Sequence, residues 1–118
     1  MPTRTFRITV RGVFDGLEPG QRAELLARAP EHDVLHAAFT PEGHLCYDLA
    51  ARPAFTFRFQ DSGEAAEDIL AATERAETAA RAWLTERGYG YKNLRSQAAD
   101  LSQAPLGARQ RRDARRNG

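Results

Sequence analysis

Side chains suited to ligand binding gather in one short stretch, residues 88–93, at the end of the longest helical pattern. Two glycines free the backbone there, and Tyr89, Tyr91 and Lys92 stand beside them. Tyrosine rings can stack on a ligand or hydrogen-bond to it, and a lysine can pair with an anion. The stretch is a candidate ligand-binding loop, although a turn that returns a helix to a sheet would use the same residues.

Arginines that alternate with apolar residues form a second candidate group. Arg7 and Arg11 do so in the first expected strand, and Arg58 stands between two phenylalanines. Guanidinium groups bind carboxylates and phosphates through paired hydrogen bonds. Together with the tyrosines and the lysine of residues 88–93, these arginines are the candidate residues for an anionic small molecule.

The polar face of the expected sheet is open to three interpretations. It can be a solvated surface, as is common in antiparallel sheets, a wet interface between two subunits, or a pocket for an anion. Phenylalanine and tyrosine alternate onto the other face, which argues against stacking of RNA bases on this sheet. The residues expected on the polar face are Arg7, Thr9, Arg11, Cys46, Asp48, Thr56, Arg58, Gln60, Arg95 and Gln97.

A basic stretch follows residue 106. Residues 107–118 carry a net charge of +4, whereas residues 1–106 carry −3. The basic stretch has no apolar periodicity, so we predict one folded domain over residues 1–106 and a disordered tail over 107–118. The tail can bind nucleic acid through phosphates or serve only to solubilise the protein. Its arginines are Arg109, Arg111, Arg112, Arg115 and Arg116.

The histidines and the cysteine do not match a sequence motif for metal binding or catalysis. His32, His36 and His44 lack the spacing of a zinc site, so we predict no metal. Cys46 lies two residues from His44, but no pattern supplies the hydrogen-bonded base and oxyanion site that a nucleophilic thiol needs. The sequence also lacks the glycine-rich loops of nucleotide-binding proteins, and we predict no cofactor.

Composition indicates one soluble domain with an ordinary core. The 118 residues are 42% hydrophobic and 28% charged, and a single cysteine suits a reducing compartment. No apolar run approaches the roughly 20 residues of a membrane span, and residues 1–11 lack the apolar segment of a secretory signal. We therefore expect a cytoplasmic protein that has no membrane partner.

Hydrophobic periodicity places the elements that must position these side chains. Phe6, Ile8 and Val10 share one face of a period-two pattern, and a Pro-x-Gly turn at residues 41–43 predicts a hairpin. The predicted elements, in order, are a strand over 5–11, a helix over about 19–29, strands over 33–40 and 45–50, a strand or strand continuation over 55–60, a helix over 62–87 and a strand over 92–98.

The predicted long helix has clear end signals but an awkward length. Asp61 is its expected N-cap, with Glu64 completing a capping box, and Gly88 stops it. At 1.5 Å per residue the helix would be about 39 Å long, whereas ordinary strands span roughly 20 Å. Either residues 63–68 form a separate turn, or the helix overhangs the sheet and packs against a second subunit.

This order of elements predicts an α+β fold. We expect a ferredoxin-like split βαβ sandwich, with an antiparallel sheet of four or five strands and two helices on one face, and we expect a homodimer. The predicted core consists of Phe6, Ile8, Val10, Leu35, Phe39, Leu45, Tyr47, Leu49, Phe55, Phe57 and Phe59, with Trp83 above them.

Three segments resemble an uncharacterised family of short bacterial proteins classed as a domain of unknown function. They read TFRITVRG at residues 5–12, FTPEGHL with YDL at 39–49, and WLTERGYGYKNL at 83–94. The resemblance extends through Pro105 and implies one self-contained unit of about 106 residues. It implies no activity and assigns no functional residue.

The function expected from these features is that of a small cytosolic binding or accessory protein. One alternative is an enzyme that acts on a small organic substrate in the cavity of a dimeric α+β barrel, which rests on fold analogy alone. Another is an RNA- or ribosome-associated protein that uses the arginine-rich tail.

Overall fold

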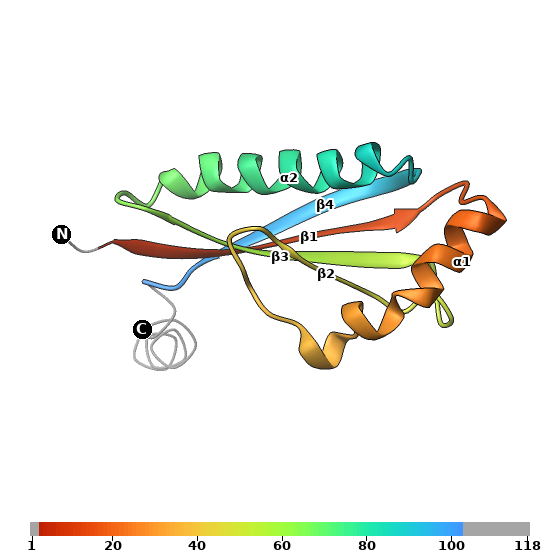
Figure 1. Ribbon diagram of the computed structural model, residues 1–118. Helices are drawn as coiled ribbons and strands as arrows, with labels where there is room; N and C mark the ends of the chain where they lie inside the picture. Colours follow the sequence, from red (N-terminus) through yellow and green to blue (C-terminus); the bar gives the residue numbers. More distant parts are fainter. Residues whose placement is uncertain (1–2, 103–118) are drawn as a thin grey trace, which may run out of the picture.

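The computed structural model describes residues 3–102, and these residues contain four strands and two α-helices (Figure 1). Two short 3-10 turns, Ala29–His32 and Val34–His36, lie between the first helix and the second strand. The main elements are β1 (Arg4–Phe14), α1 (Pro19–Ala27), β2 (His44–Tyr47), β3 (Ala54–Gly63), α2 (Asp68–Glu86) and β4 (Tyr91–Asp100).

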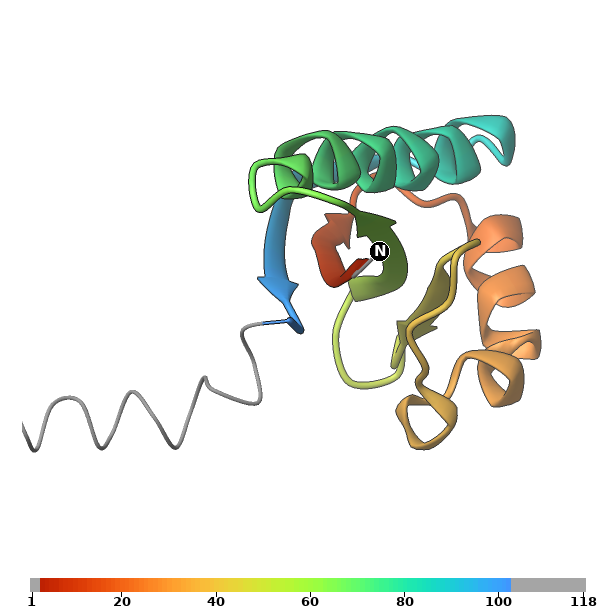
Figure 2. The same cartoon turned by 90° about the vertical axis from the view of Figure 1, so that its left-hand side faces the viewer.

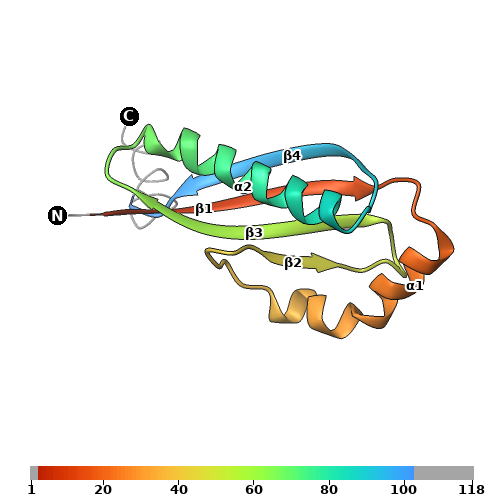
Figure 3. The same ribbon diagram turned by 45° about the horizontal axis from the view of Figure 1, so that its top comes forward.

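The four strands form one open sheet in the order β2-β3-β1-β4, and all neighbours are antiparallel. The long helix α2 runs obliquely over β1, β3 and β4, while α1 stands beside the short edge strand β2 (Figures 2 and 3). The α+β prediction with a four-stranded antiparallel sheet is therefore confirmed. The narrower description as ferredoxin-like stays a prediction.

The core lies between the sheet and its two helices. Phe6, Ile8 and Val10 of β1 are completely buried, because alternate residues of a strand point to the same face. α2 faces these residues with a stripe of small side chains, so the helix can lie close to the sheet. The stripe consists of Ala72, Ala76 and Ala80, with Leu84 at its end. α1 contributes Leu25, whose carbonyl accepts a hydrogen bond from the Tyr47 hydroxyl. The predicted core is confirmed except for Leu35 and Phe39, and Trp83 is only partly buried.

The strand predicted over residues 33–40 is wrong. Asp33 accepts a hydrogen bond from the backbone N–H of Leu35 and starts the turn Val34–His36, so this local bond replaces strand pairing. Leu35 is 84% exposed, and among the described residues the segment pairs its backbone with the sheet only at an isolated bridge from Thr40 to Phe59. The turn at residues 41–43 exists, but it leads into β2 from an irregular segment and does not join two strands of a hairpin.

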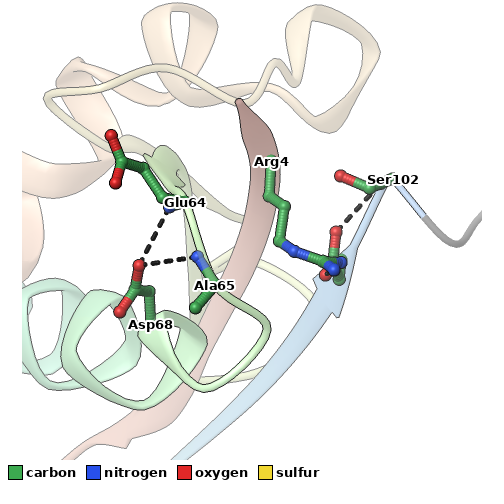
Figure 4. A network of polar contacts seen from close by, with 6 residues as sticks. Arg4, Glu64, Ala65, Asp68 and Ser102 are labelled. Carbon is green, nitrogen blue, oxygen red and sulfur yellow. Dashed lines mark hydrogen bonds and ion pairs between the residues drawn. The ribbon is translucent and has the colours of Figure 1, made fainter. Parts of the chain in front are cut away.

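The predicted start of the long helix is also wrong. Asp61 belongs to β3, and its carboxylate pairs with Arg75 at 2.9 Å. α2 begins at Asp68, whose carboxylate accepts 2.9 Å hydrogen bonds from the backbone N–H groups of Glu64 and Ala65 (Figure 4). The alternative of a separate turn before the helix is correct.

The lengths of helix and sheet agree once this boundary is moved. The 19 residues of α2 span about 28 Å, and the ten residues of β3 span about 33 Å. The start of β1 and the end of β4 are joined by an ion pair of 2.8 Å between Arg4 and Asp100. The helix therefore has no overhanging end that needs a second subunit.

Replacing Asp68 with asparagine tests the turn between β3 and α2. The backbone N–H groups of Ala65 and Glu64 hold the pKa of the Asp68 carboxyl below its ordinary value. Such a carboxyl stabilises the fold above its unfolded pKa of about 3.9, and the stabilisation is lost as the pH falls through the folded-state pKa. In urea unfolding, we expect Asp68→Asn to be less stable than the wild type at neutral pH, and we expect the difference to shrink as the pH falls below about 3.9.

The control is Glu74→Gln, which changes an exposed carboxyl of α2. It should follow the wild type over the whole pH range. If the two variants showed the same dependence on pH, the Asp68 carboxylate would not be the group that holds this turn.

Candidate functional site

A cavity of about 730 Å³ opens on the face of the sheet opposite α2. Its floor is formed by the outward side chains of β1, β2 and β3, and its walls by the two 3-10 turns and the loop between β2 and β3. The residues that line it are Arg11, Ala29, Asp33, Val34, Cys46, Tyr47, Asp48, Ala51, Arg52, Ala54, Phe55, Thr56 and Arg58.

Strand register brings the floor residues together. Thr56 of β3 lies opposite Arg11 on one side and opposite Cys46 on the other, so three strands contribute to one row. Arg58, two residues along β3, lies opposite Thr9 and His44 and shares the same outward face. The alternation that buries the phenylalanines on one side therefore places these polar groups on the other.

Arg58 is the most unusual side chain of the floor. Its Nη1 atom is buried, and within residues 3–102 it has no hydrogen-bond partner. A buried guanidinium nitrogen without a partner is costly, because it has lost water and gained nothing in return. An anion in the cavity could supply the missing acceptor.

Positive charge on this face is not balanced by ion pairs. Arg11 lies directly opposite Arg95 of β4, and like charges in opposite positions are destabilising. In the described part of the chain, the ion pairs involve Arg4, Arg75, Arg87 and Lys92, and none involves Arg11, Arg58 or Arg95. The outer face thus carries a net positive charge that a ligand could neutralise.

The Cys46 thiol lines the cavity as a buried, protonated group. Its Sγ atom lies 3.5 Å from Nδ1 of His44 and 3.9 Å from the backbone oxygen of Asp33. Burial raises the pKa of this thiol and outweighs the opposing effects of Arg58, namely its charge and its hydrogen bond to the thiol. Because the thiolate is the nucleophilic form, the site does not activate Cys46. Among residues 3–102, no group of three His, Cys, Asp or Glu side chains could hold a metal ion.

The tyrosines predicted to bind ligand lie elsewhere. Tyr89 is part of the core, and its hydroxyl donates a 3.0 Å hydrogen bond to Glu24 of α1. Burial is the main cause that raises its pKa. Tyr91 packs against the same core, and the Lys92 ammonium lies 3.8 Å from the Asp15 carboxylate. The turn at residues 88–93 therefore joins α2, α1 and β4.

Of the six predicted ligand-binding residues, the structure brings Arg11 and Arg58 together in the cavity. Arg7 lies on the same outward face, but its guanidinium stacks 5.0 Å above the ring of Phe39. Tyr89, Tyr91 and Lys92 do not line the cavity. The arginines predicted as a nucleic-acid tail, from Arg109 to Arg116, lie outside the described residues.

Sequence reasoning missed the walls of the cavity. Asp33 and Val34 fall within the strand predicted over 33–40, and none of the predicted elements contains Arg52. No local signal could have placed Val34 and Arg52, because they approach the floor through the path of two irregular segments. The Asp33-x-Leu35 turn could have been suspected from the aspartate, which often caps such turns.

The family model for DUF6204, a family of unknown function, matches residues 1–112. The chain belongs to this family. The family match confirms the resemblance seen in the sequence and covers the whole of the described structure. No curated protein and no solved structure matches the chain. No helix of residues 3–102 is long and apolar enough to cross a membrane.

Removing the Tyr89 hydroxyl tests the structural role of the turn. We expect Tyr89→Phe to lower the free energy of unfolding by about 1 kcal/mol, the usual contribution of one hydrogen bond. Urea unfolding would measure this. Tyr91→Phe is the matched control, since the structure shows no hydrogen bond of the Tyr91 hydroxyl within residues 3–102. Equal losses in both variants would contradict an anchoring role for the Tyr89–Glu24 bond.

Proposed function

We propose that the protein binds a small organic anion in the cavity on the outer face of the sheet. The observation that carries this proposal is the buried Nη1 atom of Arg58, which has no hydrogen-bond partner in the described residues and belongs to a side chain of the cavity floor. A carboxylate or phosphate would give it a charge-assisted hydrogen bond. The cavity volume of about 730 Å³ also falls in the usual range of small-molecule sites, roughly 300–1,000 Å³.

The rest of the lining suits an organic body attached to the anionic group. Val34, Ala51 and Phe55 offer apolar contact, while Asp33 and Asp48 can accept hydrogen bonds from hydroxyl or amino groups. A binding role, as opposed to catalysis, is supported by the Cys46 thiol, whose raised pKa keeps it protonated. We place this function in the cytosol, since Cys46 is the single cysteine and is free.

Replacing Arg58 tests the binding site. With benzoate as the probe, Arg58→Met should weaken binding by roughly 10- to 100-fold, because a hydrogen bond to a charged group contributes about 1.5–3 kcal/mol. Calorimetric titration would measure the affinity. Arg81→Met is the control, since Arg81 is exposed on α2 and far from the cavity lining. Equal affinities of the two variants, or a wild type that binds neither benzoate nor phenyl phosphate at millimolar concentration, would contradict the proposal.

We also propose that two copies pair through β4. This strand has ten residues, lies at the edge of the sheet and pairs only with β1 among the described elements. Leu101 donates its N–H to Thr5, so from residue 95 onward the odd-numbered residues of β4 turn their backbone groups toward β1 and the even-numbered ones turn theirs outward; a register shift precedes this part of the strand. An uncovered edge of this length is a template for another strand.

The sequence of β4 is compatible with antiparallel pairing to itself. With Ser96 at the two-fold axis, Leu94 would face Ala98, and Arg95 would face Gln97 of the other copy. No two like charges then stand opposite each other over residues 94–98.

Gln97→Arg tests this pairing by light scattering. It would oppose like charges at two symmetric places, so we expect twice the mass of one chain for the wild type and a shift toward a single chain for the variant. Gln60→Arg makes the same charge change on β3, away from the edge, and should leave the dimer intact. A monomeric wild type, or a Gln97→Arg variant that stays as dimeric as the wild type, would end the proposal.

A further inference from the structure

We infer that the group held in the cavity is dianionic, of the phosphate-monoester type, and that Arg11, Arg58 and Arg95 form its subsite. This inference rests on the proposed binding function and names the chemical class of its ligand. It is carried by the placement of three guanidinium groups on one face of three neighbouring strands.

Arg11 is the centre of the subsite. It lies on β1, directly opposite Arg95 of β4, and Arg58 of β3 is its diagonal neighbour because Arg11 faces Thr56, two residues away. Side chains in opposite positions start about 5 Å apart and diagonal ones about 7–8 Å apart. Arginine side chains are long enough for all three to reach one small group between them. Because Arg11 lines the cavity, that group would sit at the rim of the cavity toward β4.

The charge of the subsite exceeds what one carboxylate can balance. None of the three arginines has an ion pair in the described residues, although Asp33 and Asp48 also line the cavity. Arg11 and Arg95 stand opposite each other and repel, and Arg58 has a buried nitrogen without an acceptor in the described residues. A carboxylate would bring one negative charge and two oxygens to three positively charged guanidinium groups.

A phosphate monoester matches this arrangement better. It carries close to two negative charges at neutral pH and three terminal oxygens, each able to accept hydrogen bonds from a guanidinium group. Each of the three arginines can then donate hydrogen bonds to one oxygen. The negative charge of the ligand attracts both Arg11 and Arg95 and offsets the repulsion between them. The walls formed by the 3-10 turns and the loop after β2 favour a small molecule over the continuous backbone of a nucleic acid.

The test compares three probes on the full chain at pH ~7.5, by calorimetric titration: phenyl phosphate, benzoate and methyl phenyl phosphate. Only the first is a dianion at this pH, since the second pKa of a phosphate monoester is about 6. We expect phenyl phosphate to bind at least about tenfold more tightly than the two monoanions.

Arg95→Met tests the contribution of the subsite to binding separately from that of the rest of the cavity. The substitution should weaken the binding of phenyl phosphate by about tenfold. It should change the affinity for benzoate by less than about twofold, because Arg95 does not line the cavity. Lys92→Met is the matched control on the same strand, since Lys92 pairs with Asp15, and it should leave both affinities unchanged. Without ligand, Arg95→Met should raise the thermal midpoint, because it removes one of two opposed like charges.

The outcomes distinguish this inference from the proposed function. If phenyl phosphate and benzoate bound with equal affinity, and Arg58→Met weakened the binding of both, the inference of a dianionic ligand would be wrong. The proposed anion-binding function would then still stand. Failure of all three probes to bind would overturn both. A short single-stranded oligonucleotide that binds more tightly than phenyl phosphate, with strong dependence on salt, would overturn the small-molecule phosphate.

Discussion

The pairing of β1 with both β3 and β4 is the constraint on which the rest of the structure depends. Phe6, Ile8 and Val10 are completely buried under α2, and the residues between them face the opposite side. A slip of one residue in either pairing would exchange the two faces and place arginines in the core. The register that makes the core is therefore the same register that collects Arg11, Arg58 and Arg95 on the outer face.

The cavity results from a difference between the two faces of the sheet: helices cover one face, and irregular segments approach the other. The alanines of α2 let one helix cover β1, β3 and β4 closely, and α1 needs to add only Leu25 beside β2. Within residues 3–102, no α-helix covers the outer face, which the 3-10 turns, the loop after β2 and the ring of Phe39 approach. Because such segments do not pack in a regular layer, they leave space between themselves and the polar floor.

Much of the fold could be predicted, and the failures have local causes. The alternation of β1 and β3 and nearly all core residues followed from periodicity, and the end of α2 just before Gly88 followed from the glycine stop signal. Leu35 was misassigned because three alternating apolar residues look the same in a strand and in a turn capped by Asp33. Asp61 was misassigned because an N-cap pattern and a strand-end ion pair with Arg75 use the same residue type. For the candidate site, Arg11 and Arg58 were predicted, while Tyr89 proved to be buried core.

By itself, the sequence determined which residues share a face, because side-chain alternation along a strand is a property of the backbone. It also determined the family and the class of fold. Only the tertiary structure decided which parts of the polar face became a cavity, that Arg11 stands opposite Arg95, and that the Arg58 Nη1 atom is buried without a partner. These features arise from strand order and from the path of irregular loops, and both are set by contacts between residues far apart in the chain.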